Sequence, residues 1–166
     1  MHVKPILPLL ALVLGGLVST VGAVEKQAQV RHGLEVETAG GKVKVRLTVE
    51  NHGETTIYVP REVAAGDELT GPRFDVRELK GGKAAKALAY TGMMVKRGAL
   101  TAADYQAVAP NTVHMNTIDI TSTYAFKKGK GAYEIRYDGP WLTGTGQLDA
   151  IQQSPAAPVR FDFTGR

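Results

Sequence analysis

The sequence has no cysteine, so disulfides cannot stabilise the fold and no cysteine nucleophile is present. The H-E-x-x-H zinc motif, the G-x-S-x-G elbow and the Gly-rich phosphate loops are also missing. His32 precedes Gly-Leu-Glu and His52 precedes Gly-Glu, so neither has a partner histidine one helical turn away. Acidic residues are plentiful, but their spacing does not pair any two for acid–base chemistry. These absences predict that the protein is not an enzyme.

Dense runs of positive charge are missing as well. The formal net charge is +4 over 166 residues, and the basic residues are scattered among acidic ones. No basic run is interleaved with aromatic residues, so a nucleic-acid partner is not expected. The mild excess of positive charge favours only an acidic partner.

The N-terminal residues have the pattern of an export signal. Lys4 precedes an almost wholly apolar run over residues 6–18, and Val21-Gly22-Ala23 supplies small residues for cleavage. The run is shorter than the roughly 20 residues of a membrane span, which makes an uncleaved anchor the weaker alternative. We therefore expect a signal peptide over residues 1–23, cleaved near Ala23. The mature protein would be periplasmic or secreted in a bacterium, with no membrane attachment.

Apolar residues alternate with polar ones along most of the mature chain, which is typical of half-buried antiparallel strands. The pattern recurs over residues 34–36, 42–50, 55–59, 73–79, 85–90, 112–120, 132–137 and 158–163. Glycine pairs at 40–41 and 81–82 are expected to be hairpin turns. Residues 24–166 are thus predicted to form a single all-β domain, an immunoglobulin-like antiparallel β-sandwich of about seven or eight strands.

Several expectations concern individual residues. In the strand at 112–120, Val113, Met115, Ile118 and Ile120 are expected to face the core, with a one-residue irregularity between them. Tyr133 fits a tyrosine corner, whose hydroxyl bonds to backbone upstream. Residues 101–107 could form one helical turn capped by Thr101.

Metal binding is the alternative that residue types alone leave open. His32, His52 and His114, with Met93, Met94 and Met115, are imidazole and thioether ligands of the kind that suits copper. They lie far apart in the sequence, and Met115 is expected to pack in the core. No cofactor is therefore expected, and a copper carrier is kept as one form of the alternative function, a general envelope binding or structural module.

Residues 90–105, YTGMMVKRGALTAADY, follow neither the strand nor the helix period. Together with later landmarks they resemble the N-terminal immunoglobulin-like pro-region of secreted bacterial peptidyl-lysine metalloendopeptidases of the deuterolysin (aspzincin) group. The resemblance covers residues 30–166 as ordered landmarks, of which 90–105 are the most specific. The matching positions are Tyr90-Thr91-Gly92, Met94, Lys96-Arg97, Asp104-Tyr105, Ala109-Pro110-Asn111, Asp119 to Tyr124 and Gly131 to Tyr137.

The resemblance implies a module that restrains a peptidase. In the family a zinc peptidase domain follows this pro-region, and its H-E-x-x-H motif is absent from these 166 residues, so no peptidase activity carries over. The expected partner is a secreted metallopeptidase whose lysine pocket Lys96 would enter, and the free module is expected to be a monomer. The implied partner-binding residues are Met93, Met94, Val95, Lys96, Arg97, Asp104 and Tyr105.

The same segment also has a purely structural interpretation. Met93 or Met94 would cover the core, and Lys96 and Arg97 would form a solvated edge. The exposure of these side chains in the structure distinguishes the two interpretations.

Overall fold

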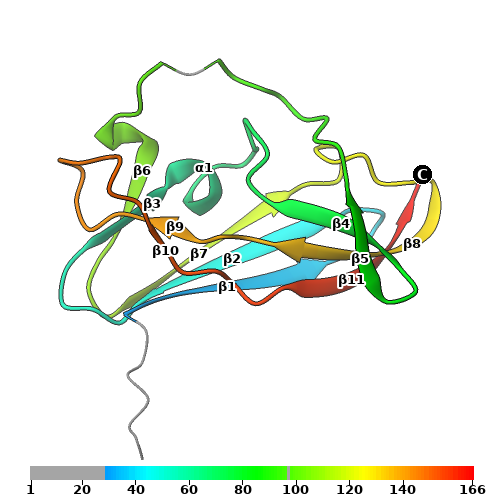
Figure 1. Ribbon diagram of the computed structural model, residues 1–166, viewed down its shortest axis with the longest axis horizontal. Coiled ribbons are helices and arrows are strands. Elements are labelled where there is room, and N and C mark those ends of the chain that lie inside the picture. Colours follow the sequence, from blue (N-terminus) through cyan, green and yellow to red (C-terminus); the bar gives the residue numbers. More distant parts are fainter. Residues whose placement is uncertain (1–28, 97) are drawn as a thin grey trace, which may run out of the picture.

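The computed structural model describes residues 29–96 and 98–166 (Figure 1). The expected signal peptide and Arg97 lie outside the described residues. The elements in chain order are β1 (Val30–Glu37), β2 (Lys44–Asn51), β3 (Ile57–Pro60), α1 (Arg61–Ala64), β4 (Asp75–Lys80), β5 (Lys83–Ala87), the 3-10 helix η1 (Ala102–Asp104), β6 (Tyr105–Val108), β7 (Thr112–Asp119), β8 (Gly129–Arg136), β9 (Pro140–Trp141), β10 (Gln152–Gln153) and β11 (Val159–Gly165).

The eleven strands form antiparallel sheets, which confirms the predicted all-β class. One sheet has the order β1-β2-β7 and a second has the order β11-β8-β4-β5. Two-stranded ribbons, β3-β6 and β10-β9, complete the set. All eight predicted strands are present, and the three additional ones, β6, β9 and β10, have only two to four residues each. In the described part of the chain, no helix is long and apolar enough to span a membrane.

The strongest periodic pattern in the sequence corresponds to β2, the central strand of the three-stranded sheet. Val45 and Val49 are fully buried, whereas Lys44 and Arg46 on the opposite face are exposed. Gly40 precedes this strand with a φ of 63°, a left-handed conformation that glycine adopts without steric cost. The alternation of apolar residues and the glycine turn therefore produce the predicted hairpin of β1 and β2.

The four-stranded sheet contributes the other half of the core. Tyr133, Ile135 and Tyr137 are buried together, as their spacing in β8 predicts. They join the inward side chains of β2 in one hydrophobic cluster. The hydroxyl of Tyr133 accepts a hydrogen bond from the backbone N–H of Lys127 at 3.3 Å, the upstream contact expected of it.

The prediction for β7 was wrong in its first half. Val113 and Met115 are 58% and 62% exposed, so neither belongs to the core. His114 and Asn116 point inward instead, and they alternate without interruption into buried Ile118. The strand pairs residue by residue with β2, so the expected irregularity is absent.

The inward polar residues of β7 are satisfied by carbonyl groups at and just after α1. Nε2 of His114 donates to the carbonyl of Ala64 at 2.6 Å. The side-chain amide of Asn116 donates to the carbonyls of Val63 and Gly66 at 3.1 and 2.9 Å. The last carbonyls of a helix have no partner within it, so these side chains cap α1 from the neighbouring strand. This demand for donors explains why polar residues occupy the inner face here.

The hydroxyl of Tyr124 joins the two larger sheets at one end. It donates to the carbonyl of Phe74 at 2.8 Å and accepts from the Phe74 N–H at 3.1 Å. Tyr124 follows β7, and Phe74 immediately precedes β4, so one side chain fixes the spacing between the sheets. Burial raises the pKa of Tyr124 to about 12, which keeps the hydroxyl protonated as a donor.

Replacing Tyr124 with Phe should destabilise the protein, because both backbone groups of buried Phe74 lose their partner. We expect a loss of about 1–3 kcal/mol in the free energy of unfolding, measured by urea denaturation. The control Tyr58→Phe removes a hydroxyl from a half-buried ring and should change stability by no more than about 0.5 kcal/mol. Equal effects of the two substitutions would contradict a special role for Tyr124.

Candidate functional site

The segment over residues 91–96, here called the contact segment, lies in the long connection between β5 and η1 and contains no helix or strand. Figure 1 shows this connection arching over α1. At its start Tyr90 forms an isolated antiparallel bridge with Tyr124. The N–H groups of Thr91 and Gly92 then donate to the carbonyl of Thr123 at 2.8 and 3.2 Å. The segment thus begins with a bend at Gly92 that is attached to the turn after β7.

The hydroxyl of Tyr90 and the loop before β4 hold the contact segment further along. The single phenolic proton is shared between the carbonyls of Leu69 and Met93, at 2.9 and 2.8 Å. The N–H of Val95 donates to the carbonyl of Thr70 at 3.3 Å. Burial raises the pKa of Tyr90, so its hydroxyl remains a donor. Backbone and phenol together fix the path of residues 91–95.

A buried carboxylate supports the loop that carries these acceptors. The side chain of Glu62 in α1 is only 3% exposed, and its carboxylate accepts from the N–H of Thr70. The guanidinium of Arg73 donates to the same carboxylate at 2.8 Å. A charge-assisted bond of this kind is stronger than a neutral one, so the loop is a firm base for the contact segment.

The side chains of the contact segment face solvent. Met93, Met94 and Val95 are 58%, 75% and 47% exposed, and Lys96 is exposed beside them. Neither methionine covers the core, which excludes that part of the structural interpretation. Three consecutive exposed apolar side chains are unusual on a soluble protein and are typical of a contact surface.

The other predicted site residues occupy different positions. Asp104 is the last residue of η1, where its carboxylate accepts from the N–H and the hydroxyl of Thr101 at 2.8 and 3.0 Å. The predicted helical turn is therefore present as η1, with Thr101 before it, but it ends at Asp104, and residues 105–107 belong to β6. Tyr105 is only 7% exposed and pairs with Pro60 in the β3-β6 ribbon. Both residues stabilise the far end of the connection and present little surface to a partner.

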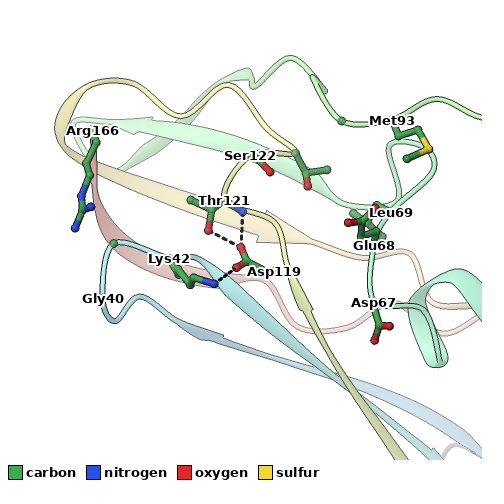
Figure 2. Close-up of a pocket in the computed structure, with 13 residues that line it drawn as sticks. Gly40, Lys42, Asp67, Glu68, Leu69, Met93, Asp119, Thr121, Ser122 and Arg166 are labelled. Carbon is green, nitrogen blue, oxygen red and sulfur yellow. Dashed lines mark hydrogen bonds and ion pairs between the residues drawn. The ribbon is translucent and has the colours of Figure 1, made fainter.

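A groove of about 690 Å³ opens next to Met93 (Figure 2). Asp119 lies in it and accepts from the ammonium of Lys42 at 3.1 Å and from the hydroxyl of Thr121 at 2.5 Å. Burial alone would raise the pKa of Asp119, but the Thr121 hydrogen bonds and Lys42 lower it overall. The lining also includes the exposed carboxylates of Asp67 and Glu68, but no histidine. The groove offers a polar wall beside the exposed side chain of Met93.

The three histidines among the described residues each make a separate contact. Nδ1 of His32 donates to the carbonyl of Ser154 at 3.0 Å, and Nε2 of His52 lies 2.7 Å from the Glu50 carboxylate. His114 caps α1, as described above. Across residues 29–96 and 98–166, no group of three or more His, Cys, Asp or Glu side chains is placed to hold a metal ion.

Sequence reasoning identified the exposed side chains of the contact segment but missed what holds them. The acceptors are the backbone carbonyls of Leu69, Thr70 and Thr123, and backbone groups leave no trace in residue identity. Only the phenol of Tyr90 could have been noticed, as a polar aromatic residue at the start of an irregular segment.

Comparisons with known proteins add little. No protein-family model matches the chain, and no curated protein matches it. Among solved structures, the X-ray structure of Northeast Structural Genomics Consortium target SoR45 is similar at 12% identity. The match covers 82% of this chain and 87% of that chain, with a TM-score of 0.40. A likeness at this level defines neither a family nor a function.

The burial of His32 predicts a pH-dependent stability. Burial lowers the pKa of His32 from 6.5 to about 4, so the folded protein keeps this imidazole neutral while the unfolded chain binds a proton. Stability should therefore fall as the pH drops from 6.5 towards 4, by roughly 3 kcal/mol from this residue alone. Urea denaturation at a series of pH values measures the slope.

The variant His32→Gln should flatten this slope between pH 6.5 and 4, whatever its stability at neutral pH. The control His52→Gln removes a solvent-exposed imidazole and should leave the slope in place. An unchanged slope in His32→Gln would show that another group governs the acid sensitivity.

Proposed function

We propose that this protein binds and restrains a secreted, lysine-specific zinc metallopeptidase of the deuterolysin type. The observation that carries the proposal is the contact segment itself, in which Met93, Met94 and Val95 stand exposed next to Lys96 on a backbone that is held by hydrogen bonds. In this proposal Lys96 enters the acidic pocket that such a peptidase needs for its substrate lysine. The protein acts as a binding module and not as an enzyme.

The physical support is preorganisation. A segment whose backbone is already fixed loses less conformational entropy on binding than a free peptide of the same sequence. The bonds to Thr123 and Thr70 fix the residues just before Lys96. Methionine side chains adapt to irregular apolar surfaces, so Met93 and Met94 can supply contact area around the pocket.

The cellular setting is part of the same proposal. The signal-like residues 1–23 favour export, so protein and peptidase would meet in the periplasm or outside the cell. A fold without cysteine does not depend on the redox state of either compartment. The same contact could also help a peptidase to fold, and recovery of activity after refolding in the presence of this protein would reveal that role.

We also propose that the fold is an immunoglobulin-like sandwich. The order β1-β2-β7 corresponds to strands A, B and E of such a domain, and β11-β8-β4-β5 corresponds to G, F, C and C′. The hydroxyl of Tyr133 in β8 bonds to backbone upstream, as the conserved tyrosine of strand F does. In this arrangement α1 and the ribbon β3-β6 are insertions beside the sandwich.

Lys96→Ala should weaken inhibition of a lysine-specific metallopeptidase, because the variant lacks the side chain proposed to occupy the pocket. We expect the inhibition constant to rise at least about tenfold, equivalent to about 1.4 kcal/mol. The measurement is the rate of cleavage of a lysyl substrate against concentration of the purified protein. The control Lys86→Ala removes an equally exposed lysine from β5 and should have no effect.

Two results would count against this proposal at different levels. If the unchanged protein neither binds nor slows such a peptidase at micromolar concentration, the proposed partner is wrong. If it inhibits but Lys96→Ala inhibits equally well, the partner stands and the contact lies elsewhere.

Tyr90→Phe tests whether the fixed backbone of the contact segment contributes to inhibition. The variant frees the carbonyls of Leu69 and Met93 while Lys96 and its neighbours keep their identities. We expect weaker inhibition, by roughly three- to tenfold, and faster amide hydrogen exchange over residues 91–96. Faster exchange with unchanged inhibition would mean that side-chain identity alone determines binding.

A further inference from the structure

Strand β7 is an edge strand without the features that protect other edges. Its order in the sheet leaves it with β2 as its only partner among the described strands. Edges are commonly protected by short length, lysine, proline or bulges. The edge strand β5 has five residues, carries Lys83 and Lys86, and pairs with β4 through a register shift. In contrast, β7 has eight residues in unbroken register, and residues 112–118 contain no lysine, arginine or proline.

The hydrogen-bond pattern shows which backbone groups of β7 are unpaired. The N–H of Ile120 donates to the carbonyl of Val43 at 2.9 Å, so residue 120 faces β2. In an antiparallel ladder this orientation alternates, and residues 118, 116, 114 and 112 therefore also face β2. The N–H and C=O groups of Val113, Met115 and Thr117 point to the open edge. Within the described part of the chain they have no hydrogen-bond partner.

The same three residues present their side chains to solvent. Val113 and Met115 are more than half exposed, and Thr117 is exposed beside them. Val113 and Met115 are on this outer face because His114 and Asn116 occupy the inner one, where they bond to carbonyls at α1. Each of the three positions therefore combines an unpaired backbone with a side chain that gains from being covered.

We propose that β7 pairs antiparallel with β7 of a second copy of this chain, with the two-fold axis at Met115. Val113 then lies opposite Thr117 of the partner copy, and the two Met115 residues lie opposite each other. All three pairs join residues whose N–H and C=O groups face the edge, which gives on the order of six backbone hydrogen bonds. The two three-stranded sheets become one continuous sheet of six strands.

A second copy fits this edge better than a foreign strand. A two-fold axis perpendicular to the sheet places odd-numbered residues opposite odd-numbered residues, so the open edge is complementary to itself in hydrogen bonding and in side-chain face. The paired stretch 112–118 carries no formal charge at neutral pH, and Asp119 comes opposite Asn111. No like charges therefore lie opposite each other in the dimer, and no residue in the paired stretch favours a charged partner. The proposed dimer is an alternative to the monomer expected from the sequence. It does not depend on the proposed function.

Analytical ultracentrifugation of the full chain over about 1–500 µM tests the proposal. We expect a concentration-dependent approach to twice the chain mass. Met115→Lys places two positive charges opposite each other on the axis and should raise the dissociation constant at least about tenfold. The control Ala84→Lys adds the same charge to the exposed edge strand β5 and should leave the dimer intact.

A second variant separates edge pairing from other modes of association. Thr117→Pro removes an N–H that faces the open edge and is not needed for pairing with β2, so the fold should be retained, as circular dichroism can verify. It should abolish the dimer, and in the unchanged protein the amides of residues 113, 115 and 117 should exchange more slowly as concentration rises.

Three outcomes would overturn the proposal. The unchanged protein could stay monomeric at all concentrations, which includes the case that only a foreign strand binds the edge. A dimer could persist in both Met115→Lys and Thr117→Pro. A dimer could be lost in Ala84→Lys but not in the β7 variants, which would place the interface on β5.

Discussion

The two hydrogen bonds between the Tyr124 hydroxyl and the backbone of Phe74 fix the end of the molecule on which the candidate site depends. They join the turn after β7 to the start of β4, and hence one large sheet to the other. Tyr90 packs edge-on against the ring of Tyr124, with centroids 5.6 Å apart. The contact segment follows directly after Tyr90, so its position depends on this pair of tyrosines.

Buried polar side chains take the place that disulfides have in many small exported domains. Asn51 is the clearest case, because its amide donates to the carbonyls of Thr55, Val108 and Ala109 and its oxygen accepts from the N–H of Gly53. These bonds tie the connection after β2 to the connection before β7. Glu62 plays the same part for the loop at residue 70. Each satisfied group also penalises alternative packings in which it would lose its partners.

The sequence predicted those parts of the fold in which side-chain pattern alone decides the structure. In β2 apolar residues alternate with polar ones, and in β8 Tyr133 and Ile135 share one face; the burial of these apolar residues followed as expected. In β7 the pattern misled, because His114 and Asn116 face inward only to satisfy carbonyls near α1. That requirement arises from a helix distant in sequence, so no local pattern could reveal it. The same limit applies to the site: exposure of Lys96 follows from its type, whereas its backbone supports do not. The resemblance to peptidase pro-regions stays a prediction.

The hydrogen bonds that hold the contact segment determine which of its side chains can change without disturbing its backbone. Within the described part of the chain, residues 91–95 are held by the hydroxyls of Tyr90 and Thr91 and otherwise by backbone groups. The side chains of Met93, Met94 and Lys96 are therefore free to vary without disturbing the frame that displays them. Under the proposed function, divergence at these positions would change the partner while the fold stayed constant, much as loops diversify on a common antibody framework.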